Sequence, residues 1–119
     1  MKTPGPDHLI TISRNGRRVR VRFAARIVAD TTRALTLREA HYPPVHYIPR
    51  ADMDMSALTR TAHSTHCPYK GDASYFTIAA DGRTAENAVW SYEQPFPAVA
   101  EIKEYLAFYP NRVDAIEEE

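Results

Sequence analysis

Hydrophobic and polar residues alternate along residues 18–23, which is the pattern of a β-strand with one buried face. Two valines and a phenylalanine fall on one side of this segment, and arginines occupy the positions between them. An apolar segment at residues 9–13 precedes it, and the Asn15-Gly16 dipeptide between the two favours a type I′ turn. The pattern predicts a β-hairpin made of residues 9–13 and 18–23.

A second hairpin is predicted where residues 73–80 and 83–92 flank Asp81-Gly82, which also suits a tight turn. Shorter strands are expected at four further places, namely residues 27–29, 35–38, 45–48 and 112–116. We expect an irregular or helical turn within residues 51–58. Residues 59–72 have no clear period, so the sequence predicts a long loop there, and long ordered loops often carry function.

The C-terminal part of the chain shows a helical period. Val99, Ile102, Leu106 and Tyr109 recur at the spacing of one helix face, and Pro97 suits the first turn. The fold class predicted from these elements is α+β and mainly β. We expect two packed or partly closed antiparallel sheets, barrel-like in arrangement, with one C-terminal helix.

The chain has 119 residues, which is enough for one domain with one modest core. We expect a single domain over residues 1–119, with flexible ends at residues 1–7 and at the acidic residues 117–119. No apolar run approaches the roughly 20 residues needed to cross a bilayer, and no apolar signal segment precedes the domain. Cys67 is the only cysteine, so no internal disulfide can form. These features predict a cytoplasmic protein with no membrane partner.

The formal net charge is zero, but its distribution along the chain is uneven. Residues 1–40 carry nine basic and three acidic side chains, and residues 81–119 carry three basic and nine acidic ones. A basic half can form a nucleic-acid face. The interpretation we favour is that strands from the two ends lie side by side and their charges pair, so nucleic acid is not an expected partner.

The polar segment at residues 64–72 is the richest in reactive groups. Cys67 would act as a nucleophile if a nearby cation such as Lys70 stabilised its thiolate, although a lone cysteine is usually a small buried hydrophobe. Lys70-Gly71 offers a charge and a close backbone approach to an anion. His63, His66 and Cys67 lie close together, but a structural zinc site takes four ligands in spaced pairs. We therefore predict no metal ion and no other cofactor.

Aromatic residues lie on or beside the predicted strands, and six of them are candidates: Tyr42, Tyr47, Tyr69, Tyr75, Trp90 and Tyr92. Aromatic side chains around one mouth of a β-structure would form a pocket for a flat ligand, and core packing would explain them as well. The phosphate-binding loop motif, G-x-S-x-G and H-E-x-x-H are all absent.

Four motifs follow one another along the chain: VHYIPR at residues 45–50, THCPYKG at 65–71, AENAVWSY at 85–92, and LAFY followed by RVD within 106–114. Together they resemble the family called domain of unknown function 427, over about residues 5–116. The resemblance implies a compact β-structure comparable with the β-tent. It also implies a pocket lined by eight residues: Tyr47, Thr65, Cys67, Lys70, Gly71, Tyr75, Trp90 and Tyr92.

The family has carried a nucleotidyltransferase label. That chemistry usually needs paired carboxylates around a divalent metal, and Asp52 and Asp54 are the only closely spaced aspartates here.

Three functions therefore stay open. The first is a binding module for a small polar or anionic ligand, held at residues 65–71 with Lys70 as charge partner. The second is an enzyme that uses Cys67 or Lys70 in transferase or thiol chemistry. The third is a structural or interaction protein that forms a homodimer through an exposed sheet edge.

Overall fold

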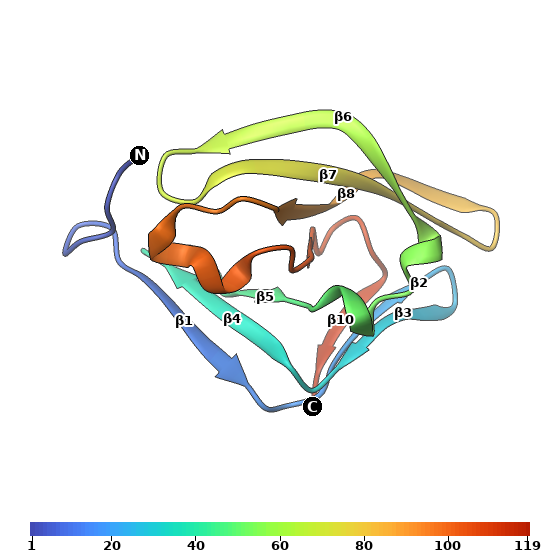
Figure 1. Ribbon diagram of the computed structural model, residues 1–119. Helices are drawn as coiled ribbons and strands as arrows, with labels where there is room; N and C mark the ends of the chain where they lie inside the picture. Colours follow the sequence, from blue (N-terminus) through green and yellow to red (C-terminus); the bar gives the residue numbers. More distant parts are fainter.

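Ten β-strands form three antiparallel sheets in the computed structural model, which describes residues 1–119 (Figure 1). The first sheet has the order β1-β4-β5: β1 (Ile10–Asn15), β4 (Ala34–Glu39) and β5 (Val45–Tyr47). The second has the order β10-β2-β3: β2 (Val19–Phe23), β3 (Arg26–Thr31) and β10 (Ala115–Glu118). The third has the order β6-β7-β8-β9: β6 (Leu58–Cys67), β7 (Gly71–Ala80), β8 (Arg83–Tyr92) and β9 (Ala107–Phe108). The helical segments are three short 3-10 turns: η1 (Arg50–Asp52), η2 (Met55–Ala57) and η3 (Pro97–Ile102).

The three sheets pack around two hydrophobic cores. In Figure 1, β6, β7 and β8 run across the top of the view, β1 and β4 form the lower left side, and β2, β3 and β10 lie at the lower right. The mainly β class is confirmed. The expected pair of packed or partly closed sheets is replaced by three sheets, none of which closes on itself.

Strand β7 carries a different hydrophobic core on each of its two faces. Phe76 and Ile78 belong to the larger core, which also contains much of the second sheet. Ala73 and Tyr75 point to the opposite face and belong to a smaller core with Tyr47 from the first sheet. Successive residues of one strand are thus buried on both sides. The smaller core surrounds the candidate site described below.

The prediction of a hairpin around Asp81-Gly82 is confirmed. Asp81 has a φ of 49° and Gly82 a φ of 82°, so both central residues have the positive φ that a type I′ turn requires. Strand β7 pairs with β8 across this turn, with Ala80 opposite Arg83.

The predicted hairpin around Asn15-Gly16 is wrong. Strand β1 pairs with β4 rather than with β2, and Gly16 does not take a positive φ. Strand β2 pairs instead with β3 and β10, and its turn into β3 uses positive φ at Ala24 (53°) and Ala25 (64°). Pairing of β2 with two other strands, together with burial of its alternating apolar face in the larger core, outweighs the local preference of the Asn-Gly dipeptide.

The long loop predicted over residues 59–72 is also wrong, because most of this segment is strand β6. It forms the edge of the third sheet and pairs with β7, with Cys67 opposite Gly71. Nearly all of its side chains are exposed or half-buried. An edge strand that buries neither face has no alternation of apolar and polar residues, and the sequence therefore carried no strand signal.

The predicted C-terminal α-helix is absent. η3 is a 3-10 segment interrupted at Val99, whose φ of −125° and ψ of 27° are non-helical. Glu104 then takes a left-handed φ of 66°, and the chain continues extended, so that Leu106 forms a β-bridge with Ile48. The apolar residues at helical spacing are buried through contacts with different sheets rather than along one helix face. None of the helical segments has the length and apolar character needed to span a membrane.

The expected pairing of the basic and acidic ends is confirmed. Strand β10 lies beside β2, and Arg22 Nε donates a 2.6 Å hydrogen bond to Glu117 Oε1. Arg20 forms an ion pair with Glu119 in the same way. Backbone hydrogen bonds and ion pairs connect residues 117–119 to β2 and to Arg18 beside it.

Candidate functional site

A cavity of about 170 Å³ lies between the first and third sheets. Tyr75 on β7 lies directly opposite Trp90 on β8, so these aromatic side chains share the face that turns toward the first sheet. Most of the lining is aromatic or apolar, and it consists of Leu37, Glu39, Tyr42, Pro43, Val45, Tyr47, Lys70, Tyr75, Trp90, Tyr92 and Tyr109. A cavity of this size resembles the roughly 150 Å³ cavity known to hold one benzene ring.

Lys70 and Glu39 form an ion pair at the wall of the cavity, and both side chains are nearly buried, with exposed fractions of 11% and 12%. Glu39 Oε2 also lies 2.7 Å from His8 Nε2. Burial by itself would raise the pKa of Glu39, but hydrogen bonds from Lys70 and His8 outweigh that effect and hold the pKa below its usual value. The ammonium also lies 5.9 Å from the centre of the Tyr92 ring. The cavity therefore presents a positive and a negative group that balance each other.

Hydroxyl groups of three tyrosines and a threonine form two short hydrogen-bonded sets around the cavity. The Tyr75 hydroxyl lies 3.0 Å from Thr65 Oγ1 and 3.2 Å from the Tyr109 hydroxyl. On another wall, Trp90 Nε1 donates a 3.3 Å hydrogen bond to the Tyr47 hydroxyl. These contacts fix the ring orientations.

The Tyr92 hydroxyl differs from the other three, because it makes no hydrogen bond to another group of the protein. Burial raises the pKa of Tyr109 to about 12 and also raises the pKa values of Tyr47 and Tyr92. These hydroxyls therefore stay protonated at neutral pH, and the Tyr92 hydroxyl is free to donate to a guest in the cavity.

Two further cavities adjoin this one. A larger cavity of about 470 Å³ shares Tyr42, Pro43, Val45 and Trp90 with it. A third cavity of about 320 Å³ lies behind Tyr75 and Tyr109, and its remaining lining is polar: His63, Asn87, Asn111 and Arg112. The aromatic cavity is thus the middle member of three, with an apolar neighbour on one side and a polar neighbour on the other.

Five of the eight residues singled out by the sequence line the aromatic cavity: Tyr47, Lys70, Tyr75, Trp90 and Tyr92. Thr65 contacts the cavity only through Tyr75. Cys67 is half-buried against the smaller core and does not line the cavity. Gly71 has a φ of 111°, and a Cβ there would lie 3.4 Å from the Gln94 carbonyl oxygen. Its role is to bring this backbone segment close, so that the Phe96 amide donates to the Lys70 carbonyl.

Sequence reasoning missed Glu39 and Tyr109. Glu39 ends strand β4 and Tyr109 follows β9, so neither is near the 64–72 segment in the sequence. Tyr69, one of the aromatic candidates, lies outside the cavity and stacks on the His8 ring with the ring centres 3.9 Å apart. Glu39 and Tyr109 reach the cavity because β4 pairs with β5, β9 pairs with β8, and Lys70 of the β6–β7 turn contacts the end of β4.

Three of the side chains with the chemistry to bind a metal, Asp52, Asp54 and His66, are engaged in other contacts. Asp52 pairs with Arg33, whose hydrogen bond lowers the pKa of that carboxyl, and Asp54 accepts hydrogen bonds from Ser56 that lower its pKa. His66 Nδ1 lies 2.7 Å from Asp72. No group of three or more His, Cys, Asp or Glu side chains is placed to hold a metal ion.

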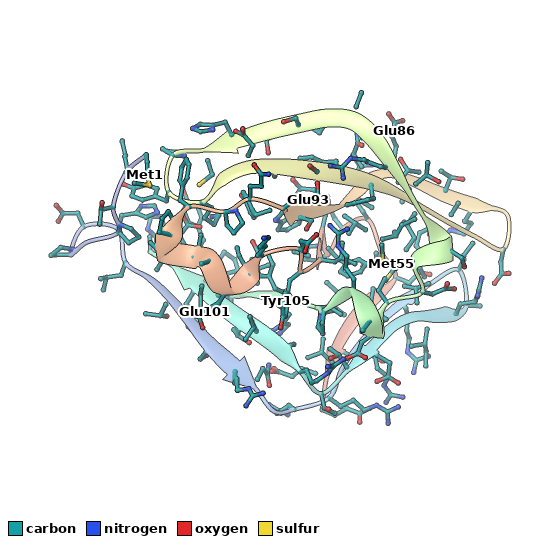
Figure 2. All side chains as sticks on the ribbon, viewed as in Figure 1. Met1, Met55, Glu86, Glu93, Glu101 and Tyr105 are labelled. Atoms are coloured by element: carbon teal, nitrogen blue, oxygen red, sulfur yellow. The ribbon has the colours of Figure 1, made fainter.

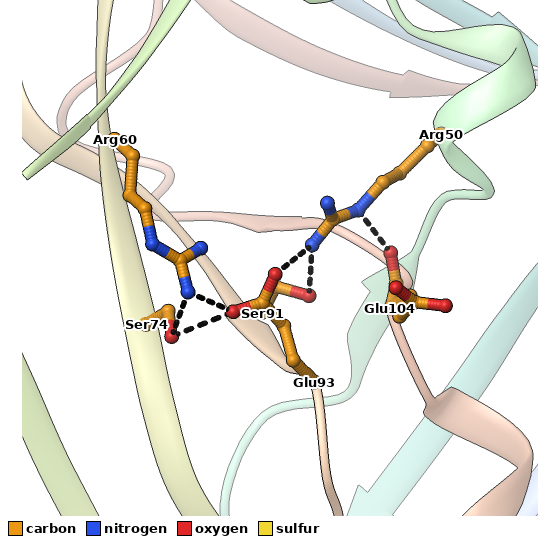
Figure 3. Close-up of polar contacts among 6 residues, drawn as sticks. All are labelled: Arg50, Arg60, Ser74, Ser91, Glu93 and Glu104. Carbon is orange, nitrogen blue, oxygen red and sulfur yellow. Dashed lines mark hydrogen bonds and ion pairs between the residues drawn. The ribbon is translucent and has the colours of Figure 1, made fainter.

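A second polar network lies on the opposite face of β7 and β8 (Figure 3). Glu93 accepts hydrogen bonds from Arg50 at 3.0 Å, from Ser74 at 2.9 Å, and from Arg60. Arg50 also donates to the buried Ser91 hydroxyl at 3.1 Å and to the Glu104 carbonyl at 2.7 Å. Figure 2 labels Glu93, which lies toward the middle of the molecule beneath β6 and β7. This network ties η1 to three strands of the third sheet and supports the wall of the aromatic cavity from behind.

The fold and the cavity together define a small antiparallel β-domain with an aromatic pocket. The chain matches the family described as Domain of unknown function (DUF427) over residues 11–119, and it belongs to that family. No curated protein matches the chain.

Proposed function

We propose that this protein binds a small polar ligand, about the size of a single six-membered ring, in the cavity lined by Lys70 and the tyrosines. The observation that carries the proposal is the nearly buried Lys70–Glu39 pair on the wall of an aromatic cavity. Removing two charges from water costs several kcal/mol per ion, and apolar residues of similar size would often stabilise a fold at least as well. A role in ligand recognition accounts for keeping the pair at this place.

The ligand we favour is neutral overall rather than anionic. Glu39 balances the charge of Lys70, and it would repel an incoming carboxylate or phosphate. A ring that carries both a hydrogen-bond donor and an acceptor would satisfy Glu39, Lys70 and the free Tyr92 hydroxyl together. Trp90 and Tyr47, whose rings meet edge to face with centres 6.4 Å apart, would add apolar contacts to the ligand ring.

The test is a ligand screen read by thermal shift and by Trp90 fluorescence, since Trp90 is the only tryptophan in the chain and lines the cavity. The panel holds sugars, pyrimidines, phenolic amides, nucleotides and organic acids. Tyr92→Phe removes a hydroxyl that has no partner in the protein, so we expect weaker binding of a hit with little change in stability. Tyr69→Phe, outside the cavity, is the matched control. A hit that binds both variants equally, or a panel without any hit, would count against the proposal.

A second candidate is homodimer formation through strand β6. This strand is the edge of the third sheet, and one side of its ten-residue backbone is unpaired. Pairing with a second copy would extend the sheet. Light scattering after size exclusion gives the oligomeric state, and a proline at Thr65 would reduce a dimer formed this way. The enzyme alternative that uses the Cys67 thiol gains no support, because Cys67 does not line the cavity.

A further inference from the structure

The aromatic cavity and the 470 Å³ cavity share one wall, made of Tyr42, Pro43, Val45 and Trp90. A guest in the first cavity therefore lies directly beside the second. Tyr42 and Pro43 belong to the exposed β4–β5 connection, while Trp90 reaches the same wall from β8. The two cavities differ in chemistry as well as in size.

The larger cavity is apolar. Its deepest residues are Val21, Ile48 and Phe108, which are almost completely buried. Prolines and Ile116 form much of the remaining lining, and the one imidazole, that of His46, already contacts Thr36 Oγ1 at 3.1 Å. Water against this apolar lining finds few hydrogen-bond partners in the protein, and an apolar group that displaced it would bind favourably.

We propose that the ligand of the aromatic cavity carries an apolar substituent that occupies the larger cavity. This inference rests on the proposed function, because it takes the polar ring in the aromatic cavity as its starting point. The ligand class is then an amphipathic molecule with a small, polar, uncharged ring as its head and an aliphatic or isoprenoid-like tail. The Trp90 side chain lies between the polar ring of the ligand and its apolar substituent.

The probe is a series of N-alkyl-4-hydroxybenzamides from methyl to octyl. Their head offers a ring, a donor and an acceptor, and only the length of the apolar chain changes. We expect the dissociation constant, measured by quenching of Trp90 fluorescence, to fall about threefold to fourfold for each methylene group until the larger cavity is full. Light scattering on the same samples records the oligomeric state.

Two variants of matched chemistry locate the tail. Ile116→Phe narrows the larger cavity, and Ile27→Phe, at an exposed position on strand β3 of the same sheet, is the control. We expect Ile116→Phe to remove most of the chain-length dependence while the methyl compound binds as in the wild type. We expect Ile27→Phe to leave the whole series unchanged. Circular dichroism and the thermal midpoint establish that both variants fold.

The ways in which the proposal can fail are distinguishable. If the methyl compound binds and longer chains bind no better, the tail inference is overturned and the proposed function stands. If no compound in this series or in the ligand screen binds, both are overturned. If the wild type is a dimer that long chains or Ile116→Phe dissociate, the larger cavity is covered by a second copy of the chain, and the tail inference is overturned.

Discussion

The Lys70 ammonium and the Glu39 carboxylate form an ion pair that joins the β6–β7 turn to the end of β4. The two residues are far apart in the sequence, and the contact links the third sheet to the first. His8 adds a second partner for Glu39 from the N-terminal segment.

Replacing Lys70 with methionine leaves Glu39 nearly buried with only His8 as partner. We expect a loss of about 2–4 kcal/mol in the free energy of unfolding, measured by urea denaturation, because removal of one partner of a buried pair strands the other charge. The double variant Lys70→Met/Glu39→Gln should lose less than Lys70→Met alone. Equal losses in the single and double variants would contradict the coupling.

The Lys70–Glu39 pair makes the free energy of unfolding depend on pH. Burial raises the pKa of Glu39 and the Lys70 and His8 hydrogen bonds lower it more, so the folded pKa lies below that of the unfolded chain. The stabilisation is therefore fully present above the unfolded pKa of about 4.3 and is lost as pH falls through the lower folded value. We expect the stability difference between wild type and Glu39→Gln to shrink below about pH 4 in urea titrations. A difference that stays constant down to about pH 3 would contradict this assignment.

Behind the cavity, Glu93 accepts hydrogen bonds from Arg50, Arg60 and Ser74. Its side chain is 25% exposed. Glu93→Ala should cost about 2–3 kcal/mol of unfolding free energy, since hydrogen bonds to charged groups contribute more than neutral ones. Glu86→Ala on strand β8, which ends one residue before Glu93, is the control. Glu86 is exposed and lies near the edge of the molecule in Figure 2, and no side-chain contact is lost there. Similar effects in the two variants would mean that the network does not stabilise the fold.

The two turn glycines should respond in opposite ways to alanine. Gly82 has a positive φ, and Gly82→Ala should destabilise the protein by about 1–2 kcal/mol. A Cβ added at Gly16 would meet no other atom within 4 Å, and the φ of Gly16 is not positive. Gly16→Ala should therefore be neutral or stabilise by up to about 1 kcal/mol. Thermal midpoints of the two variants provide the measurement. Destabilisation by Gly16→Ala would indicate that Gly16 takes a positive φ, as the predicted Asn15-Gly16 hairpin requires.

Truncation before Ala115 should lower the free energy of unfolding far more than removal of the charges of residues 117–119. Strand β10 supplies backbone hydrogen bonds to β2 and places Ile116 beside the buried Val21, whereas its carboxylates are partly exposed. Glu117→Gln should cost less than about 1 kcal/mol and its effect should fade in salt. Deletion of residues 115–119 should cost several times more, and most of that loss should persist at high salt. A deletion no worse than Glu117→Gln would show that β10 contributes through charge alone.

The sequence predicted elements whose signal is local. Asp81-Gly82 specified its turn because both residues suit positive φ, and the alternating residues of β2 specified a strand with one buried face. The pairing of β2 was not predictable, since the partners that bury it lie in other parts of the chain. The helical spacing of Val99 and Ile102 predicted an α-helix that is absent, for the same reason. Those residues are buried by neighbouring strands, and periodicity does not distinguish such burial from a helix face.

The candidate site was predictable only in part. Lys70, Trp90 and Tyr92 stand in motifs that mark them, and the structure places them around one cavity. Glu39 has no such motif, so the balance of charge at the cavity, and with it the preference for a neutral ligand, needed the pairing of sheets to become visible. Cys67 drew attention by its reactivity, but its neighbours on β6 and β7 direct it toward the smaller core.

Strand β7 has one further consequence for the motions of the molecule. Tyr75 and Phe76 are consecutive residues that anchor two different cores, so neither core can loosen without disturbing the same stretch of backbone. Amide protons at these positions should exchange with solvent deuterium only when the entire chain unfolds, and those of the exposed edge strand β6 should exchange much earlier. We therefore expect the two cores to unfold as a single cooperative unit.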